Sequence, residues 1–143
     1  MRKLILTALA VPSLAGHAGM AEMIDMQIDG RSYAVVLFDN DAASAFIEHL
    51  PLTLQFEDFG TTERIAYLKQ SLKTGGAPTS MTPVPGDLAY YRPWANLAVF
   101  VRPFRHSEDL VSLGRLSPEG LAALARSGNH PVTFARGVKG GHD

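Results

Sequence analysis

The chain has 143 residues, 46% of them hydrophobic, which suits a single domain with a substantial core. Its 13 basic and 14 acidic residues nearly cancel and form no basic run, so the sequence disfavours a nucleic-acid partner. The absence of cysteine excludes disulfides and thiolate chemistry, so stability must come from packing alone.

The first 21 residues have the pattern of a bacterial secretory signal. Arg2 and Lys3 precede an apolar run over 4–14, which is too short to span a bilayer and is followed by small residues. Cleavage after Ala18 or Ala21 fits this pattern, and we favour Ala21. The alternative interpretation of the apolar run is an N-terminal core helix.

Removing the signal defines the expected domain organisation. It leaves 11 of the 13 basic residues against 14 acids, so the mature domain is mildly acidic. We expect residues 1–21 to be a signal peptide, 22–137 to be the folded domain and 138–143 to be a disordered tail. The mature protein is then periplasmic or secreted and has no stable membrane anchor.

The first half of the chain predicts hairpins and one helix. Residues 24–29 and 33–37 alternate around a tight turn at Gly30, which predicts a first hairpin. Acidic and amide residues at 39–41 then cap a helix that ends at Pro51. Two further strands are predicted over 52–57 and 62–68, with a turn over 58–61 between them.

The stretch 86–104 organises the rest of the chain, because it holds nearly half of the aromatic side chains. Apolar residues alternate on either side of a corner at 92–96, where Pro93 cannot donate to a strand ladder. This pattern predicts a central antiparallel hairpin. Its rings form one wall of the core and leave Trp94 at the corner for another contact.

The remaining segments complete a β-rich domain. Residues 69–85 are rich in glycine and proline and predict a long exposed loop. A charged linker over 106–109 leads to a strand over 110–116, and Ser117 caps a second helix with Leu121, Leu124 and Ala125 as its buried stripe. A last strand follows over 131–136.

These elements amount to about eight strands in hairpin order and two short helices. The predicted fold class is therefore mainly β, a closed antiparallel eight-stranded barrel with a helix at each open end. No parallel βαβ unit is required.

The order of elements resembles the cyclophilin barrel. The segments DAASAFIEHLPLTLQFEDFG, TERIAYL, PGDLAYYRPWANLAVFVRPF and LVSLGRLS are similar to the bacterial and archaeal family of cyclophilin-like proteins. The resemblance extends from Met26 to Phe134, with Leu50-Pro51, Gly86-Asp87 and Pro93-Trp94 among the residues in register. It implies the architecture more directly than an activity.

The resemblance also bears on catalysis. Cyclophilins are peptidyl-prolyl isomerases that place an apolar pocket around a proline ring and donate to the prolyl nitrogen from an arginine. That arginine belongs to a Phe-His-Arg run after the first helix, where this chain has Leu54-Gln55-Phe56 followed by acids. An isomerase here would need another arginine, and the candidates are Arg64, Arg92 and Arg102.

Three groups of residues are candidates for a site. The predicted ligand-binding residues line an aromatic groove: Phe56, Phe59, Tyr91, Trp94, Phe100 and Glu57. The acids Glu57, Asp58 and Glu63 could act as an acid and base pair or hold a cation, although they are more typical of a solvated hairpin end. Asp87 is expected to anchor the long loop.

The linker near Arg105 and His106 could bind an anion or a metal, but an exposed charged linker is the simpler interpretation. The histidines are scattered, and the sequence has no phosphate loop, nucleophile elbow or dinucleotide fingerprint. We therefore predict neither a metal site nor a cofactor.

Three functional hypotheses follow. The first is a binding module that receives a peptide or small molecule, and the second is a prolyl isomerase that assists the folding of exported proteins. The third is an unrelated enzyme that uses the acids of the 57–63 hairpin. The sequence specifies neither the identity of the ligand nor the oligomeric state.

Overall fold

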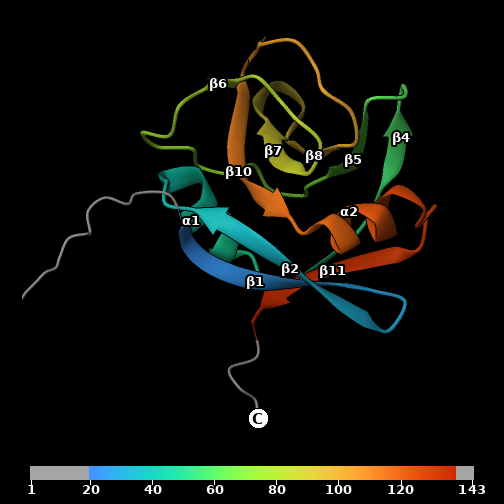
Figure 1. The fold of residues 1–143 in the computed structure, drawn as a ribbon. Coiled ribbons are helices and arrows are strands. Elements are labelled where there is room, and N and C mark those ends of the chain that lie inside the picture. Colours follow the sequence, from blue (N-terminus) through green and yellow to red (C-terminus); the bar gives the residue numbers. More distant parts are fainter. Residues whose placement is uncertain (1–19, 138–143) are drawn as a thin grey trace, which may run out of the picture.

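A computed structural model describes residues 20–137, which fold as strands wrapped around one core, with two helices (Figure 1). The strands are β1 (Met20–Ile28), β2 (Arg31–Phe38), β3 (Leu52–Gln55), β4 (Glu57–Phe59), β5 (Glu63–Tyr67), β6 (Ser80–Met81), β7 (Asp87–Tyr91), β8 (Asn96–Phe100), β9 (Ser107–Glu108), β10 (Leu110–Leu116) and β11 (Pro131–Arg136). The helices are α1 (Asp41–Glu48) and α2 (Pro118–Ala125), and a 3-10 turn, η2 (Arg92–Trp94), joins β7 to β8.

Nine of the strands form one antiparallel sheet in the order β3, β11, β1, β2, β10, β7, β8, β5, β4. The predicted β-barrel class is confirmed, with nine strands in this sheet in place of eight. The additional strand arises because the segment predicted as one strand over 52–57 is divided at the buried Phe56. The turn predicted over 58–61 is correspondingly shorter, since β4 continues to Phe59.

The division at Phe56 closes the barrel. β3 pairs with β11 at one edge of the sheet, whereas β4 pairs with β5 at the other edge. A single stretch of chain therefore connects both edges, and the sheet curls into a nearly closed barrel (Figure 1). Closure of this kind protects strand edges that would otherwise be open to pairing with another chain.

Side-chain alternation decides which residues fill the barrel. On β8, Leu97 and Val99 point into the interior core, whereas Ala98 and Phe100 belong to a second cluster on the outer face. All five residues of β8 are buried, so both of its faces are covered. Its nearly continuous apolar sequence is typical of such a strand.

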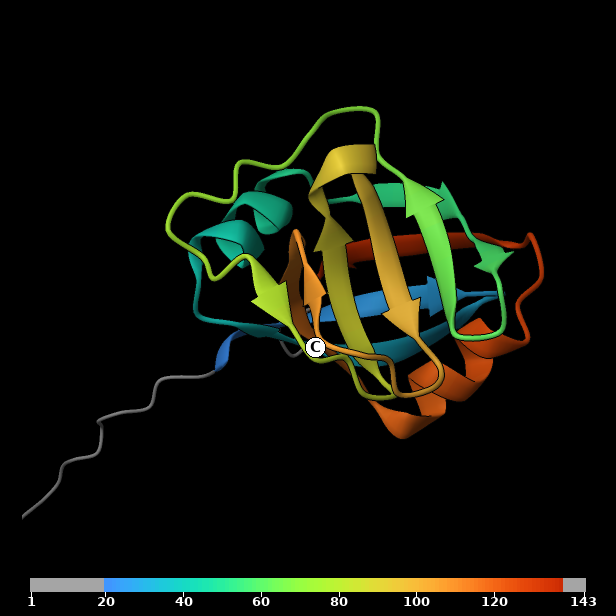
Figure 2. The ribbon, with the colours of Figure 1, turned by 90° about the horizontal axis from the view of Figure 1, so that it is seen from above.

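Both helices begin as the sequence predicts and lie at opposite ends of the barrel (Figure 2). Asn40 caps α1 by accepting from the Ala43 amide at 2.8 Å. Ser117 caps α2 by accepting from the Gly120 amide at 3.1 Å. Each cap satisfies a backbone donor that the first helical turn leaves free.

The buried stripe predicted for α2 needs a correction. Leu124 is buried as expected, but Ala125 is exposed and Leu121 is only partly buried. Gly120 and Ala123 face the core in their place, because the buried face of the helix is shifted by one residue toward the N-terminus. Gly120 suits this position, since an added Cβ would lie 3.1 Å from the Cβ of Tyr33.

The loop predicted as exposed over 69–85 is anchored at several points. Leu72 and Ala77 are buried in the main core. The Leu72 amide donates to the Tyr90 hydroxyl, with 3.1 Å between the two atoms. Further along, β6 pairs with β9 in a separate two-stranded sheet. The prediction of an exposed loop is therefore wrong for these residues, because side chains of the loop supply part of the core.

The ends of the chain fall outside the described residues. The predicted signal lies there up to residue 19, as does the tail over 138–143. β1 begins at Met20, which pairs with Phe38, so cleavage after Ala18 would leave the strand whole and cleavage after Ala21 would shorten it. Within residues 20–137, no helix is long and apolar enough to cross a membrane.

Candidate functional site

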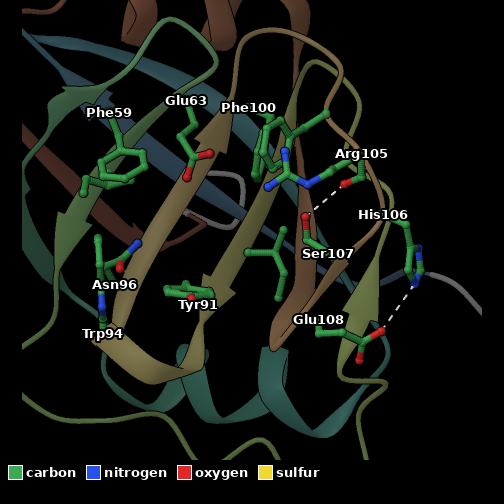
Figure 3. Close-up of a pocket in the computed structure, with 13 residues that line it drawn as sticks. Phe59, Glu63, Tyr91, Trp94, Asn96, Phe100, Arg105, His106, Ser107 and Glu108 are labelled. Atoms are coloured by element: carbon green, nitrogen blue, oxygen red, sulfur yellow. Dashed lines mark hydrogen bonds and ion pairs between the residues drawn. The ribbon is translucent and has the colours of Figure 1, made fainter.

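A pocket of about 400 Å³ lies on the outer face of the barrel (Figure 3). Strands β4, β5, β7, β8 and β10 contribute to it, together with η2 and the segment 104–108, which includes β9. The lining residues are Phe59, Glu63, Ile65, Tyr91, Trp94, Asn96, Phe100, Phe104, Arg105, His106, Ser107, Glu108 and Leu110.

The floor of the pocket is apolar and buried. Ile65, Phe100 and Leu110 are almost fully buried and belong to the outer-face cluster. Phe104 stacks on Phe100 with ring centroids 6.2 Å apart and 27° between the ring planes. This floor is formed where the chain after β8 folds back over the sheet, so it depends on contacts between distant segments.

One end of the pocket is an aromatic corner, which consists of Phe59, Tyr91 and Trp94. The Phe59 and Trp94 rings lie 5.6 Å apart at 81°, and the Tyr91 and Trp94 rings lie 5.7 Å apart at 82°. Edge-to-face pairs of this kind are a favourable aromatic geometry. Trp94 is still 50% exposed and Phe59 47% exposed, so much of their ring surface is free to contact a ligand.

Glu63 brings a carboxylate to the pocket next to this corner. It sits directly across from Phe59 in the pairing of β4 with β5, and across from Phe100 in the pairing of β5 with β8. Desolvation by burial raises the pKa of the half-buried Glu63 carboxyl above its ordinary value. Within residues 20–137, no ion pair or side-chain hydrogen bond satisfies this carboxylate.

Asn96 places a second acceptor in the lining. Its side chain is 2% exposed, and its Nδ2 donates to the Leu97 carbonyl at 3.0 Å. Its Oδ1 is buried and has no hydrogen-bond partner among the residues that the structure describes. Leaving a buried acceptor unpaired costs about 1–3 kcal/mol, so a ligand N–H at this position would recover stability.

The other end of the pocket carries charged side chains of both signs. The Arg105 guanidinium lies 4.5 Å from the centroid of the Phe104 ring, and His106 and Glu108 are exposed nearby. In Figure 3, Glu63 and Arg105 extend over the pocket from opposite sides. No ion pair joins these two side chains in the described part of the chain. The acceptors Glu63 and Asn96 thus lie near the aromatic corner, whereas the Arg105 guanidinium comes from the segment at the other end, which also carries His106 and Glu108.

The structure brings together four of the six predicted ligand-binding residues. Phe59, Tyr91, Trp94 and Phe100 all line the pocket. Phe56 does not, because it is 1% exposed and packs on Phe134 inside the barrel. Glu57 is exposed on β4 and lies outside the lining.

None of the three arginines predicted for catalysis lines the pocket. Arg64 is buried and donates to Asp58 Oδ1, to Ser127 Oγ, to two backbone carbonyls around the end of α2 and to the Phe56 carbonyl between β3 and β4. Arg92 pairs with Asp109 at 2.7 Å, which ties η2 to the segment that covers the floor. Arg102 is exposed and lies outside the lining.

The acids of the hairpin also separate. Asp58 pairs with Arg64 at 2.8 Å, whereas Glu63 faces the pocket. They therefore do not form the acid and base pair that the sequence left open. Asp87 accepts from the Val84 amide at 2.9 Å and pairs with Arg115, so it anchors the loop as predicted.

Sequence reasoning missed Asn96 and Arg105 as lining residues. The sequence predicts Asn96 as the end of the corner over 92–96, and it places Arg105 in a charged linker that could bind an anion but is more simply interpreted as exposed. The available signal was the lack of polar alternation in β8, which implies that some segment covers its outer face.

The rest of residues 20–137 offers no comparable site. No group of three or more His, Asp or Glu side chains there could hold a metal ion. A second cavity lies between the β1–β2 turn and the end of α2, where Arg31, Arg126 and His130 are all exposed. It contains no predicted site residue.

Comparison with known proteins identifies the fold family. The model of the cyclophilin-like family matches residues 26–135. The chain belongs to the cyclophilin-like family. The solution structure of a hypothetical protein from Archaeoglobus fulgidus is similar to this cyclophilin-like barrel, with a TM-score of 0.57 and 17% sequence identity. That match covers 85% of this chain and 99% of the archaeal chain, and it bears on the fold alone. No curated protein matches the chain.

Proposed function

We propose that this cyclophilin-like protein is an exported binding protein that takes a small molecule or a peptide segment into the outer-face pocket. The observation that carries the proposal is an apolar floor beneath exposed aromatic rings, with two unsatisfied polar groups, Glu63 and Asn96, beside them.

The size and lining of the pocket support this proposal. Small-molecule sites are concave, mostly apolar and about 300–1,000 Å³ in volume, and the pocket of about 400 Å³ falls within that range. Natural sites of this kind carry a few polar groups that orient the ligand. Glu63, Asn96 and Arg105 are suited to that role, since each reaches the lining from a different segment.

Trp94 supplies the readout for a test, because it is the only tryptophan in the sequence and lies at the pocket. We would screen short peptides and small molecules for a saturable change in its fluorescence. Phe59→Ala should weaken a genuine ligand about tenfold or more, because it removes an exposed aromatic contact. Tyr67→Ala is the matched control: its ring is 51% exposed on the same β4–β5 hairpin but lies outside the lining. Equal losses in both variants would contradict the proposal.

A second candidate function is prolyl isomerisation, and the position of Arg105 favours it. This arginine lies beside the apolar floor, which could receive a proline ring, and its guanidinium could donate to the prolyl nitrogen. Such donation weakens amide resonance and lowers a barrier of about 18–20 kcal/mol. Arg105 would then replace the arginine missing from the strand after α1.

Exchange between cis and trans proline in a reporter peptide tests this candidate. The isomerase hypothesis expects catalysis that Arg105→Ala abolishes and that Arg102→Ala retains, since Arg102 is an exposed arginine outside the lining. Absence of catalysis in the unaltered protein would contradict the isomerase hypothesis, and binding would remain as the proposed function.

A further inference from the structure

We propose that the aromatic corner recognises an alkylammonium cation, such as a quaternary ammonium group, held against Phe59, Tyr91 and Trp94 and paired with Glu63. The inference rests on the proposed function, because it names the chemical class of the ligand for the same pocket.

The rings have the arrangement that such a cation requires. Trp94 stands nearly perpendicular to both of its neighbours, at 81° to Phe59 and 82° to Tyr91. Rings that meet at right angles form the corner of a box and direct more than one π face toward the same space. The negative faces of aromatic rings attract cations within about 6 Å, and the attraction is strongest for tryptophan.

Glu63 supplies the counter-charge. Its backbone is the direct cross-strand partner of Phe59, so carboxylate and ring project from neighbouring positions. Burial has removed part of its hydration, and no cation compensates it among residues 20–137. A half-buried carboxylate without a partner destabilises the free protein, and an ammonium ligand would remove that penalty.

Asn96 extends the same preference. Its buried Oδ1 has no hydrogen-bond partner within residues 20–137, and its backbone lies directly opposite Tyr91 in the pairing of β7 with β8. The unsatisfied polar atoms near the aromatic corner are therefore acceptors, whereas the Arg105 guanidinium extends over the pocket from the opposite side (Figure 3). This end of the pocket selects for positive charge or N–H donors.

The donor set favours an organic cation over a metal ion. Hard metal ions require several oxygen ligands, and no cluster of three His, Asp or Glu side chains exists within residues 20–137. One carboxylate beside three rings instead matches a bulky, weakly hydrated cation, which gains from contact with apolar ring surface.

The test compares two probes of equal shape. Choline carries the cation, and the alcohol in which carbon replaces the choline nitrogen is its neutral isostere. Each is titrated into the full-length protein while the Trp94 fluorescence is followed, with sodium chloride holding the ionic strength constant. We expect choline to bind about tenfold more tightly than the isostere.

Glu63→Gln should remove most of the preference for choline over the isostere and leave the part that the aromatic rings supply, while Glu48→Gln retains the whole preference. Glu48 is exposed on α1 outside the lining, so this control removes the same charge from elsewhere. Equal binding of both probes to the unaltered protein would overturn the cation inference, but the proposal that the pocket binds a ligand would stand. If the Trp94 fluorescence does not respond to choline but does respond to members of the peptide and small-molecule screen, the cation inference is likewise overturned and the binding function stands. If the fluorescence responds to none of these probes, both proposals are overturned.

Discussion

Glu63 is the residue whose environment is hardest to explain by folding alone. Its carboxylate is half-buried and raised in pKa by desolvation, and it has no partner within residues 20–137. Proteins keep such destabilising groups where function requires them, because activity and stability compete at binding sites. A ligand that compensates the charge would account for its position.

This environment makes the stability of the protein depend on pH. The folded-state pKa of Glu63 lies above its unfolded value, taken as 4.5, so its contribution is fully present below that pH and is lost as pH rises through the folded pKa. Glu63→Gln should therefore raise the melting temperature at pH 7 and have little effect near pH 3.5. Thermal unfolding of both proteins at the two pH values checks this. A variant less stable than the unaltered protein at pH 7 would show that the carboxylate is stabilised in the fold.

Arg64 and Arg102 should contribute very differently to the stability of the fold. The Arg64 guanidinium is buried and holds the end of α2 against β4 and β5 through five hydrogen bonds. Arg64→Ala should lower the free energy of unfolding by at least about 3 kcal/mol, since it leaves buried carbonyls unpaired. Arg102→Ala should change it by less than about 0.5 kcal/mol. Denaturant unfolding measures both, and equal effects would contradict a structural role for Arg64.

Among the elements, β10 connects the two halves of the barrel. It pairs with β2 on one side and with β7 on the other. Its register against β7 shifts between Ser112 and Gly114, which is the signature of a bulge. At Gly114 the neighbouring strand comes so close that an added Cβ would lie 2.0 Å from the Val36 carbonyl oxygen. Only glycine fits there without movement of the backbone.

Gly114→Ala should accordingly destabilise the protein by about 1–3 kcal/mol, because β2 must move away from β10. Ser112→Ala, in the same strand, is the control, since the described hydrogen bond at Ser112 uses its backbone carbonyl. The two free energies of unfolding can be compared by urea titration. If Gly114→Ala is as stable as the control, the prediction is wrong, because β2 can then move away from β10 with little loss of free energy.

Local patterns predicted most of these elements. The central hairpin, both helix caps and the last strand follow from alternation, proline position and capping residues, which act over a few residues. The division at Phe56 was not predictable in this way. Leu52, Leu54 and Phe56 alternate as in one strand over 52–57, and only the choice of pairing partner separates β3 from β4.

At the scale of the whole molecule, the pocket exists because one segment folds over the outer face of a nearly closed barrel. The aromatic residues were predictable as a group because they cluster around the central hairpin. The positions of Asn96 and Arg105 were not, since they depend on the packing of 101–109 against distant strands. Phe56 was misplaced for the same reason, because an alternating pattern does not say which face of a strand lies inside the barrel.

Export of the whole chain is a separate prediction. We expect a bacterial host that expresses the full sequence to release a processed form beyond the cytoplasmic membrane, with an N-terminus at Gly19 or Glu22. Cleavage before Gly19 keeps β1 whole, whereas cleavage before Glu22 removes its first two residues. Fractionation and N-terminal sequencing check this. Unprocessed protein confined to the cytoplasm would contradict the proposed localisation.

The most direct test of the central claim, that the pocket binds an alkylammonium cation at its aromatic corner, is a titration of isotope-labelled protein with choline, followed by NMR. We predict saturable shifts at the Trp94 indole N–H and at the backbone amides of residues 63 and 96, and Glu63→Gln should require several-fold more choline to saturate them. The amide signals of Arg126 and His130, at the second cavity, should not shift. Shifts centred on that second cavity, or none at all, would contradict the account.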